Sequence, residues 1–534
     1  MPSVFSVDVD TSSRSFFLDF IERVGNRLPD PITLFALGTL MVMIASQLAV
    51  TLDWQVTPVQ PVVVGSNDQG PIIDWQPLPD KEAAQSLFSS DGLFWAISNL
   101  VKNFIEFPPL GVVLVGMLGI GVAELTGLIG ALLKLFMMLV PRWLLTPSVV
   151  FIGIMSSMAL DAGYIVLPPL AAALYQAAGR SPLAGIAASF AGVSAGFNAN
   201  LLVTGLDPLL AGFSSEGARV IQSDYEVAAT CNWWFMIVST VTMTLTGWAT
   251  TAWFVERRLA DRPADEAGVL AADQLSVQRL TAEEVGGLQW ALAAMVVVGA
   301  ALGCLILIEG APLYGIGARF PRWVESIVPM IFIGFFVPGL AFGIRTGNIT
   351  SDKSASQLLN KSIATMAPII VLSFFAAQFI SCFRYSNLDR MLALSGGQAL
   401  ARAEMPPILL ILVFILLTAV FNLFVGSMSA KYAMFAPVFV PMLMMVGISP
   451  ELTQAAYRIG DSITNIITPL NAYLVIVLVF VQRYAPQAGM GTLISAMMPY
   501  TFAFGVVWMV QIVIWMLAGW PLGVEGPLHY PPGG

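Results

Sequence analysis

Apolar runs of about 20 residues recur along the whole chain, and that is the length an α-helix needs to cross the hydrocarbon core of a bilayer. Only 11% of the 534 residues are charged, and 57% are hydrophobic. Soluble globular domains carry about 25% charged residues. The sequence therefore predicts an all-α, polytopic membrane protein. We expect apolar spans within 32–51, 108–140, 147–178, 232–256, 288–309, 325–346, 362–383, 407–447, 467–482 and 497–519.

The residue inventory excludes several classes of function. The only histidine, His529, lies in the C-terminal tail, and the three cysteines form no CxxC pair, so we expect neither histidine chemistry in the membrane nor a zinc site. No nucleotide-binding loop of the G-x-x-x-x-G-K-[ST] type and no HExxH motif occurs. With a net charge of −9, no polybasic patch dominates. We expect a protein that is not an enzyme, has no cofactor and binds no nucleic acid; its expected partners are the lipid bilayer and a small-molecule substrate.

The distribution of lysine and arginine predicts the orientation, because cytoplasmic segments carry an excess of both. The N-terminal tail and the middle linker are rich in arginine, whereas the loop 52–90 has only Lys81 and the C-terminal tail has neither residue. The arginines concerned are Arg14, Arg23, Arg27, Arg257, Arg258, Arg262 and Arg279. We expect a cytoplasmic N-terminus and an external C-terminus, which requires an odd number of crossings. Nine crossings plus non-crossing segments fit.

An internal repeat relates the two halves. "SPLAGIAASFAGVS" at 181–194 and "SPELTQAAYRIGDS" at 449–462 share the pattern S-P-x4-A-A-x3-G-x-S at an offset of 268 residues. Repeated halves are typical of secondary transporters, whose substrate sites lie near the bilayer midplane where broken helices meet. The repeat and the odd number of crossings favour an inverted relation between a first half at 1–256 and a second at 288–534, joined by a cytoplasmic linker at 257–287.

Polar residues gather just after each copy of the repeat and precede a proline. The first set is Asn198, Asn200, Thr204 and Asp207, and the second is Asp461, Ser462, Thr464, Asn465 and Thr468. A proline leaves a backbone carbonyl without its helical donor, and such carbonyls together with Asn and Asp oxygens can bind a hard cation. We expect the coupling ion near Asn198, Asn200, Asp207, Asp461, Asn465 and Thr468, with a possible Na⁺ at the first three.

Charged residues inside an apolar chain are costly and by default mark a functional site. If 451–466 is helical, Gln454, Arg458, Asp461 and Asn465 share one face and converge on one neighbour or cavity. Arg458 can hold a carboxylate through two parallel hydrogen bonds. The alternative is a structural pair in which Arg458 and Asp461 neutralise each other across one helical turn.

Other polar residues leave a site role and a packing role open. Asp207 has no lysine or arginine near it in the sequence and could bind a cation, carry a proton or cap a helix. Asp161 is alone in an apolar run and could belong to the site, cap a helix locally or pair with a distant cation. Lys431 could pair with an aspartate or reach the membrane surface. Asn422 could contribute to the site or make an interhelical hydrogen bond. Tyr432 could line a pocket or simply pack.

At these residues the sequence resembles the AbgT family, the p-aminobenzoyl-glutamate transporters. The resemblance covers nearly the whole chain and is carried by long segments. They are "IERVGNRLPDP" at 21–31, "FPPLGVVLVGMLGIGVAELTGLI" at 107–129, "DAGYIVLPPLAAALYQAAGRSPLAGIAASFAGVSAGFNANLLVTGLDPLLAG" at 161–212, and "GISPELTQAAYRIGDSITNIITPL" at 447–470.

The resemblance implies a bowl-shaped homodimer in the bacterial inner membrane, similar to the divalent-anion:sodium symporters. Each protomer would have nine transmembrane helices and two re-entrant hairpins, the first near 181–213 and the second near 384–410, with a site segment at 449–470. Members of the family are described as importers of p-aminobenzoyl-glutamate and exporters of sulfonamide antimetabolites.

The resemblance also implies a set of substrate-binding positions. They are Asn422, Ser429, Tyr432, Pro450, Arg458, Asp461 and Pro469, together with Asp207 in the first hairpin region. Tyr432 stands where the family usually has tryptophan, and "RYSN" at 384–387 stands where the usual pattern is "NWSN". The first difference shrinks an aromatic stacking surface, and the second adds the cation of Arg384.

The resulting hypothesis is a secondary transporter of p-aminobenzoyl-glutamate, related aromatic carboxylates or sulfonamide antimetabolites, coupled to Na⁺ or H⁺ and moving its hairpin domain like an elevator. A carrier of small dicarboxylates is the alternative within transporters. A membrane-embedded enzyme acting on a lipid or isoprenoid is the alternative outside them, but the acidic DDxxD pattern is absent.

Overall fold

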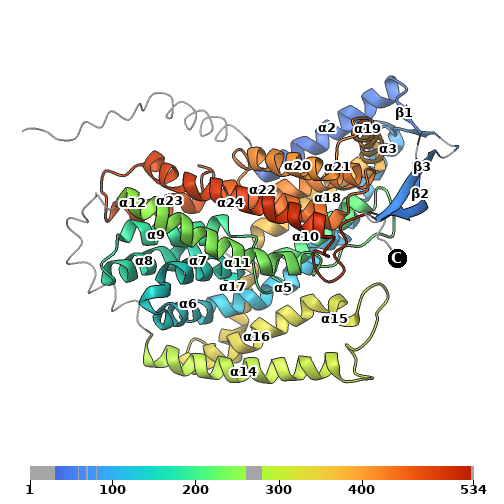
Figure 1. Ribbon diagram of the computed structural model, residues 1–534. Helices are drawn as coiled ribbons and strands as arrows, with labels where there is room; N and C mark the ends of the chain where they lie inside the picture. The colour runs from blue at the N-terminus through green and yellow to red at the C-terminus, as the bar shows by residue number, and fades with distance from the viewer. Residues whose placement is uncertain are drawn as a thin grey trace, which may run out of the picture.

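The computed structural model describes residues 30–530, apart from 58, 68–69, 78, 80, 160–161 and 260–279. Asp161, most of the predicted linker and the arginines of the N-terminal tail lie outside the described residues. The predicted orientation, which depends on those arginines, therefore stays a prediction. Long helices that run broadly in the same direction make up most of the fold (Figure 1).

The first half of the chain forms helices interrupted by short 3₁₀ and π segments. The α-helices are α2 (Pro31–Thr51), α3 (Ser90–Ser98), α4 (Leu100–Ile105), α5 (Pro108–Leu125), α6 (Leu128–Leu139), α7 (Leu145–Met155), α8 (Ala162–Ala177), α9 (Pro182–Phe190), α10 (Leu206–Ala218), α11 (Trp233–Thr250) and α12 (Glu256–Leu259). The 3₁₀ segments are η1 (Arg142–Leu144) and η2 (Ser156–Ala159), and the π segments are η3 (Ala191–Ala195) and η4 (Thr251–Val255).

The described part of the second half consists of α-helices joined by loops. Its helices are α14 (Ala282–Leu307), α15 (Arg322–Glu325), α16 (Ile327–Thr346), α17 (Asp352–Thr365), α18 (Ala367–Tyr385), α19 (Leu388–Arg402), α20 (Pro407–Asn422), α21 (Met428–Met444), α22 (Pro450–Asn465), α23 (Ala472–Gln482) and α24 (Met490–Ala518).

The strands lie in the loop predicted between the first two spans. β1 (Gln55–Val56) pairs antiparallel with β4 (Glu82–Ala83), and β2 (Val59–Asn67) pairs antiparallel with β3 (Gly70–Pro77). The β2–β3 hairpin projects from one end of the helical body (Figure 1).

Six helices within the described residues are long and apolar enough to cross a membrane: α2, α5, α14, α16, α18 and α24. This agrees with the predicted class of all-α polytopic membrane protein. The number of crossings, the re-entrant hairpins and the dimer stay predictions. Three of the predicted apolar runs are divided, and one of them, 147–178, consists of α7, η2 and α8. The run 108–140 turns between α5 and α6 at Gly127, whose φ of 91° suits glycine, and the run 407–447 breaks between α20 and α21.

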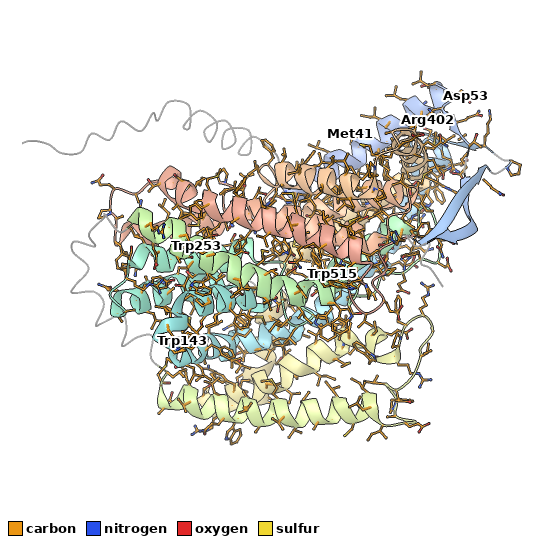
Figure 2. The ribbon with its side chains drawn as sticks, viewed as in Figure 1. Met41, Asp53, Trp143, Trp253, Arg402 and Trp515 are labelled. Atoms are coloured by element: carbon orange, nitrogen blue, oxygen red, sulfur yellow. The ribbon has the colours of Figure 1, made fainter. Side chains whose placement is uncertain are left out.

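The helices form layers around a buried centre. α14 packs on α16, and α16 packs on α5, so that these helices cover one side of the molecule (Figure 1). Only 6% of the residues in the most apolar stretch of α14 are buried, as expected of a helix that faces lipid. Trp143 and Trp253 project at one end of the body, and Asp53 and Arg402 at the other (Figure 2). Exposed tryptophans of this kind are typical of a membrane–water interface.

α22 occupies the centre. It packs against α10, α20, α21 and α24, and every residue from Pro450 to Thr464 is buried. Burial on all sides is unusual for a helix with this many polar residues. The partners of those residues therefore define the candidate site.

Candidate functional site

Local sequence explains where α22 begins and ends. The Ser449 hydroxyl caps the helix by accepting a hydrogen bond from the backbone N–H of Leu452, and Pro450 occupies the first turn, where its missing N–H costs nothing. The helix ends at Asn465, ahead of Pro469. Gly460 lets α22 approach α20, because a Cβ there would collide with the carbonyl oxygen of Ile415 and the side chain of Thr418.

The N-terminal part of the polar face of α22 is directed at α10. An Arg458 Nη2 atom lies 2.5 Å from Asp207 Oδ1, and the two side chains form a buried ion pair. One turn earlier, Gln454 Oε1 accepts a hydrogen bond of 2.8 Å from the Ser214 hydroxyl. The prediction that Asp207 belongs with the second-half site residues is consistent with this contact, which joins residues 251 positions apart.

The C-terminal part of the same face is directed at α21 and α20. Asp461 Oδ1 lies 2.7 Å from the Lys431 ammonium, and both side chains are almost completely buried. Asn422 completes the cluster: its amide nitrogen donates to the Asp461 carbonyl at 2.6 Å and to Thr464 Oγ1 at 3.0 Å, and its oxygen accepts from Lys431.

The alternative in which Arg458 and Asp461 neutralise each other across a helical turn is wrong, since each is paired with a residue of another helix. The polar face contacts two neighbours, α10 and α21. Sequence spacing showed that the two side chains could reach each other, but α10 and α21 bring oppositely charged groups within hydrogen-bonding distance from either side.

Hydrogen bonds also cross between the two copies of the repeat. Asn198, which follows η3, donates to Ser462 Oγ at 2.7 Å and to the Arg458 carbonyl at 3.1 Å. In the opposite direction, Asn471 donates to Ser194 Oγ at 3.3 Å. Ser194 and Ser462 are the final residues of the shared pattern. Each copy therefore accepts a hydrogen bond from an asparagine that follows the other copy, so the two polar breaks lie side by side.

The residues predicted to hold Na⁺ do not present a common set of free oxygens. In Asp207, Oδ1 binds Arg458, and Oδ2 accepts from the backbone N–H and hydroxyl of Thr204 at 2.6 and 2.8 Å. Asn200 donates to Ser157 at 2.9 Å. Asn198 Oδ1 and Asp461 Oδ2 are buried and have no hydrogen-bond partner. Among the described residues, no group of three or more His, Cys, Asp or Glu side chains could hold a metal ion. The Na⁺ assignment stays a prediction.

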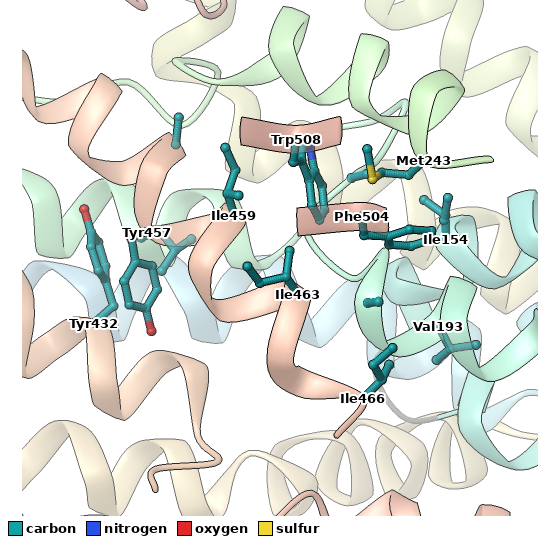
Figure 3. Packing of buried hydrophobic residues seen from close by; sticks show 14 of the residues in the cluster. Ile154, Val193, Met243, Tyr432, Tyr457, Ile459, Ile463, Ile466, Phe504 and Trp508 are labelled. Carbon is teal, nitrogen blue, oxygen red and sulfur yellow. The ribbon is translucent and has the colours of Figure 1, made fainter. Parts of the chain in front are cut away.

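The remaining predicted residues surround the ion pairs. Tyr432 is completely buried: its ring lies 4.3 Å from that of Tyr457 (Figure 3), and its hydroxyl is 2.6 Å from Ser214 Oγ. Thr468 is buried and donates to the Leu423 carbonyl at 3.2 Å. Pro450 is buried as well, whereas Ser429, Asn465 and Pro469 are partly exposed. The partly exposed residues lie where α21 begins and at or just beyond the end of α22.

Arg384, the extra cation suggested by the sequence, is not free. Its Nη2 lies 2.9 Å from a carboxylate oxygen of Glu216 on α10, and Glu216 is also paired with Arg219 at 2.6 Å. Glu216 lies two residues beyond Ser214, which contacts Gln454 and Tyr432. Arg384 is therefore held at the outer end of α10 by an ion pair.

Sequence reasoning missed three buried acids, Glu216, Asp389 and Glu451. Glu451 is only 2% exposed and lies in the first turn of α22. The Tyr225 hydroxyl is 3.1 Å from each of its carboxylate oxygens, and Asn232 donates to its backbone carbonyl at 2.9 Å. The available signal was an acid inside the repeat, where the first copy has Leu183.

Known proteins resemble this chain over almost its whole length. The family model described as "AbgT putative transporter family" matches residues 16–530. The p-aminobenzoyl-glutamate transport protein of Escherichia coli K12 is 32% identical over 528 residues, which is 98% of each chain.

Two solved structures have the same fold. The YdaH transporter of Alcanivorax borkumensis aligns with a TM-score of 0.83 at 39% identity, covering 93% of this chain and 100% of that one. MtrF of Neisseria gonorrhoeae, described as illuminating a class of antimetabolite efflux pumps, aligns with a TM-score of 0.87 at 38% identity, covering 97% of this chain and 100% of that one. The chain therefore belongs to the AbgT family of membrane transporters.

Proposed function

We propose that this chain is a secondary active transporter of p-aminobenzoyl-glutamate, related aromatic carboxylates or sulfonamide antimetabolites. The observation that carries the proposal is the state of the Arg458 guanidinium. It is buried and ion-paired with Asp207 through Nη2, but Nε has no hydrogen-bond partner and Nη1 faces only the thioether sulfur of Met236 at 3.1 Å. A guanidinium carries five N–H donors, so Arg458 has donors left for a substrate carboxylate.

The Asp207 carboxylate gives this arrangement a switch. In the conformation described here it occupies the place on Arg458 that an anionic substrate would take. Binding of the substrate carboxylate would move Asp207 away or share the guanidinium with it. Either change frees an Asp207 oxygen, which can then bind the coupling cation, Na⁺ or H⁺. Substrate and cation binding are coupled in this way because they use the same ion pair.

The transport mechanism and the oligomeric state that we propose are those implied by the family resemblance. Polar breaks from both halves meet at α22, which suits a transport domain that moves relative to the layer of α5, α14 and α16 in an elevator-like motion. The protein would act as a homodimer in the bacterial inner membrane, with a cytoplasmic N-terminus and a periplasmic C-terminus.

A carrier of small dicarboxylates remains the second candidate, and one observation favours it. Tyr432 has an exposed fraction of 0% and is packed on Tyr457, so its ring is not presented to a ligand in this conformation. An aromatic substrate would need this ring to become accessible, whereas a dicarboxylate would not.

Uptake into proteoliposomes tests the proposal. Radiolabelled p-aminobenzoyl-glutamate is offered under a Na⁺ gradient and a pH gradient imposed separately, to wild type, Arg458→Ala and Tyr432→Leu. We expect uptake driven by one gradient, its loss in Arg458→Ala, and weaker affinity in Tyr432→Leu. Tyr484→Leu, at a half-buried position outside the cluster, is the matched control. Uptake that survives in Arg458→Ala contradicts the role assigned to Arg458. A dicarboxylate that inhibits uptake as strongly in Tyr432→Leu as in wild type supports the second candidate.

A further inference from the structure

The buried acids of this protein differ sharply in how their charge is balanced. Of the five buried carboxylates in the described chain, Asp207, Glu216 and Asp461 form ion pairs with arginine or lysine. Asp389 forms no ion pair, but it lies in the sequence between Arg384 and Arg390. Its carboxylate accepts a hydrogen bond of 2.7 Å from the backbone N–H of Arg390. Glu451 forms no ion pair and lies in a sequence segment without lysine or arginine until Arg458.

The surroundings of Glu451 suit a neutral carboxyl. Among the described residues, it interacts electrostatically with Tyr225 and Cys231 from the segment before α11, with Tyr432 of α21 and with Glu525 of the C-terminal segment. None of these groups is a cation. The Tyr225 hydroxyl lies 3.1 Å from both carboxyl oxygens, and the Ser449 hydroxyl and the backbone N–H of Glu451 are further hydrogen-bond donors to the carboxyl.

The donors around Glu451, which are the Tyr225 and Ser449 hydroxyls and its own backbone N–H, satisfy an ionised carboxylate only in part. A carboxylate can accept about four hydrogen bonds, whereas a neutral carboxyl donates one and accepts one. The neutral acid can donate its proton to the tyrosine oxygen while its carbonyl oxygen accepts from the tyrosine hydroxyl. Burial of an unpaired charge is costly, which also favours the neutral form. The N-terminus of α22 acts the other way, because its backbone dipole favours an anion, and this keeps ionisation within reach.

One hydrogen-bond partner of this acid lies between exposed residues. Tyr225 is buried but stands between Asp224 and Glu226, which are both exposed. The C-terminal segment closes the same end of α22, since Ser449 donates to the carbonyl oxygens of Leu528 and Pro527 at 3.2 and 2.7 Å. A small displacement of Tyr225 or of this segment would bring water to Glu451.

We propose that Glu451 carries the coupling proton. The proton is taken from water by the Glu451 carboxylate, remains on it while α22 is covered, and returns to water when the first turn of α22 is exposed on the other side. No covalent step is involved, and one proton is bound and released per cycle.

The charge balance of the cluster explains the coupling. Asp207 and Arg458 cancel, as do Asp461 and Lys431, so the cluster is neutral when Glu451 is protonated and carries one negative charge when it is not. Arg458 lies two turns along the same helix, and Cys231 is faced by Glu451, Arg458 and Asp207 alike. An anionic substrate therefore binds better when Glu451 is neutral, and by reciprocity the bound substrate holds the proton on Glu451. This assignment rests on the proposed function, names H⁺ as its coupling ion and places that proton on Glu451 instead of Asp207.

Glu451→Gln distinguishes exchange of substrate across the membrane from accumulation driven by a pH gradient. The amide has the shape of the neutral acid but cannot release a proton. We expect exchange of labelled p-aminobenzoyl-glutamate across the vesicle membrane to persist, and accumulation under a pH gradient to fall to an internal-to-external ratio of about one. Accumulation that continues in Glu451→Gln overturns the proposal. Glu106→Gln, at an exposed glutamate, is the matched control and should accumulate as wild type.

Infrared spectroscopy of the reconstituted protein tests the protonation without any substrate. We expect wild type to show the carbonyl band of a buried neutral carboxylic acid, lost as the pH is raised, and Glu451→Gln to lack it. Persistence of the band in Glu451→Gln, and its loss in Asp389→Asn, overturns the assignment. If wild type moves no p-aminobenzoyl-glutamate, the proposed substrate fails while this measurement still decides whether Glu451 holds the proton.

Tyr225→Phe provides a second variant should Glu451→Gln not fold. It leaves the acid in place and removes its phenolic partner. We expect the pH at which the band disappears to shift, and an unchanged midpoint contradicts the proposed environment of Glu451.

Discussion

The two copies of the repeated pattern contact each other, with η3 against α22, but have different chemistry. In the first, α9 passes into the π-helix η3, and the residues from Pro182 to Ala195 are uncharged and, apart from the partly buried Leu183, buried. In the second, α22 remains α-helical to Asn465 and carries Arg458 and Asp461. At the repeat offset of 268 residues these correspond to Phe190 and Val193. One copy therefore serves as an apolar framework, while its counterpart contains the charges.

What the copies share is packing. Gly192 and Gly460 are the same position of the pattern, and each faces the backbone of a neighbouring helix: Gly192 faces the Val150 carbonyl, and Gly460 faces that of Ile415. Small residues at such positions let helices approach closely in a membrane. The residues kept in both copies therefore maintain helix contacts, whereas the residues that differ determine what the site can bind.

The largest effect is expected for Arg458→Ala, which makes the second copy as uncharged as the first. Loss of the guanidinium should lower apparent substrate affinity by about 100-fold, because hydrogen bonds to charged groups contribute up to about 3 kcal/mol. It should also destabilise the fold by about 3–5 kcal/mol, since Asp207 is left buried and unpaired. Substrate binding and thermal unfolding measure the two effects.

Two further variants separate these effects of Arg458. Adding Asp207→Asn to Arg458→Ala should restore stability but not binding. Phe190→Leu, at the matched position of the first copy, should cost less than about 1.5 kcal/mol and leave the substrate affinity unchanged. A loss of affinity in Phe190→Leu as large as that of Arg458→Ala would remove the distinction between the copies.

Lys431→Met tests the second ion pair in the same way. The substitution leaves Asp461 buried without its cation, and we expect a loss of about 3–5 kcal/mol in the free energy of unfolding. Combining it with Asp461→Asn should recover most of that loss. Denaturation of the purified variants measures both. Equal stability of wild type and Lys431→Met would show that Asp461 does not depend on Lys431.

The paired glycine substitutions test what the copies share. An added Cβ would lie 2.5 Å from the Val150 carbonyl in Gly192→Ala and would collide with the Ile415 carbonyl in Gly460→Ala. We expect each to destabilise the protein by about 1–3 kcal/mol, because the obstacle is backbone that cannot move aside. Thermal unfolding of the two variants should give similar losses. A neutral result in one of them would show that close packing is not common to both copies.

The smallest effects are expected for Ser194→Ala and Ser462→Ala, which remove the hydrogen bonds that cross between the copies. Each asparagine keeps a backbone acceptor, Asn198 on Arg458 and Asn471 on Asn465, so the loss should be about 0.5–1.5 kcal/mol. Ser462→Ala should cost more, because its bond is 2.7 Å long and that of Ser194 is 3.3 Å. Only Ser462→Ala should alter transport, since Asn198 adjoins Arg458.

Much of the site could be predicted residue by residue. The pattern of apolar runs indicated the membrane class, and the position of Arg458 and Asp461 in an uncharged chain marked α22 as unusual. Asn422, Lys431 and Asp207 were each identified as unexplained polar residues. Their partners could not be predicted, because ion pairs between residues 251 and 30 positions apart depend on how helices pack.

The sequence by itself determined which groups are costly to bury, because the free energy of transferring a charge from water depends on the side chain and its apolar surroundings. It also determined where helices start, through Ser449 and Pro450, and where they approach closely, through Gly192 and Gly460. Only the tertiary structure decided that Arg458 turns to Asp207, that Asp461 turns to Lys431, and that Glu451 is left without a cation. The physical reason is that charge pairing acts over a few ångströms, and those distances are set by helix packing rather than by spacing along the chain.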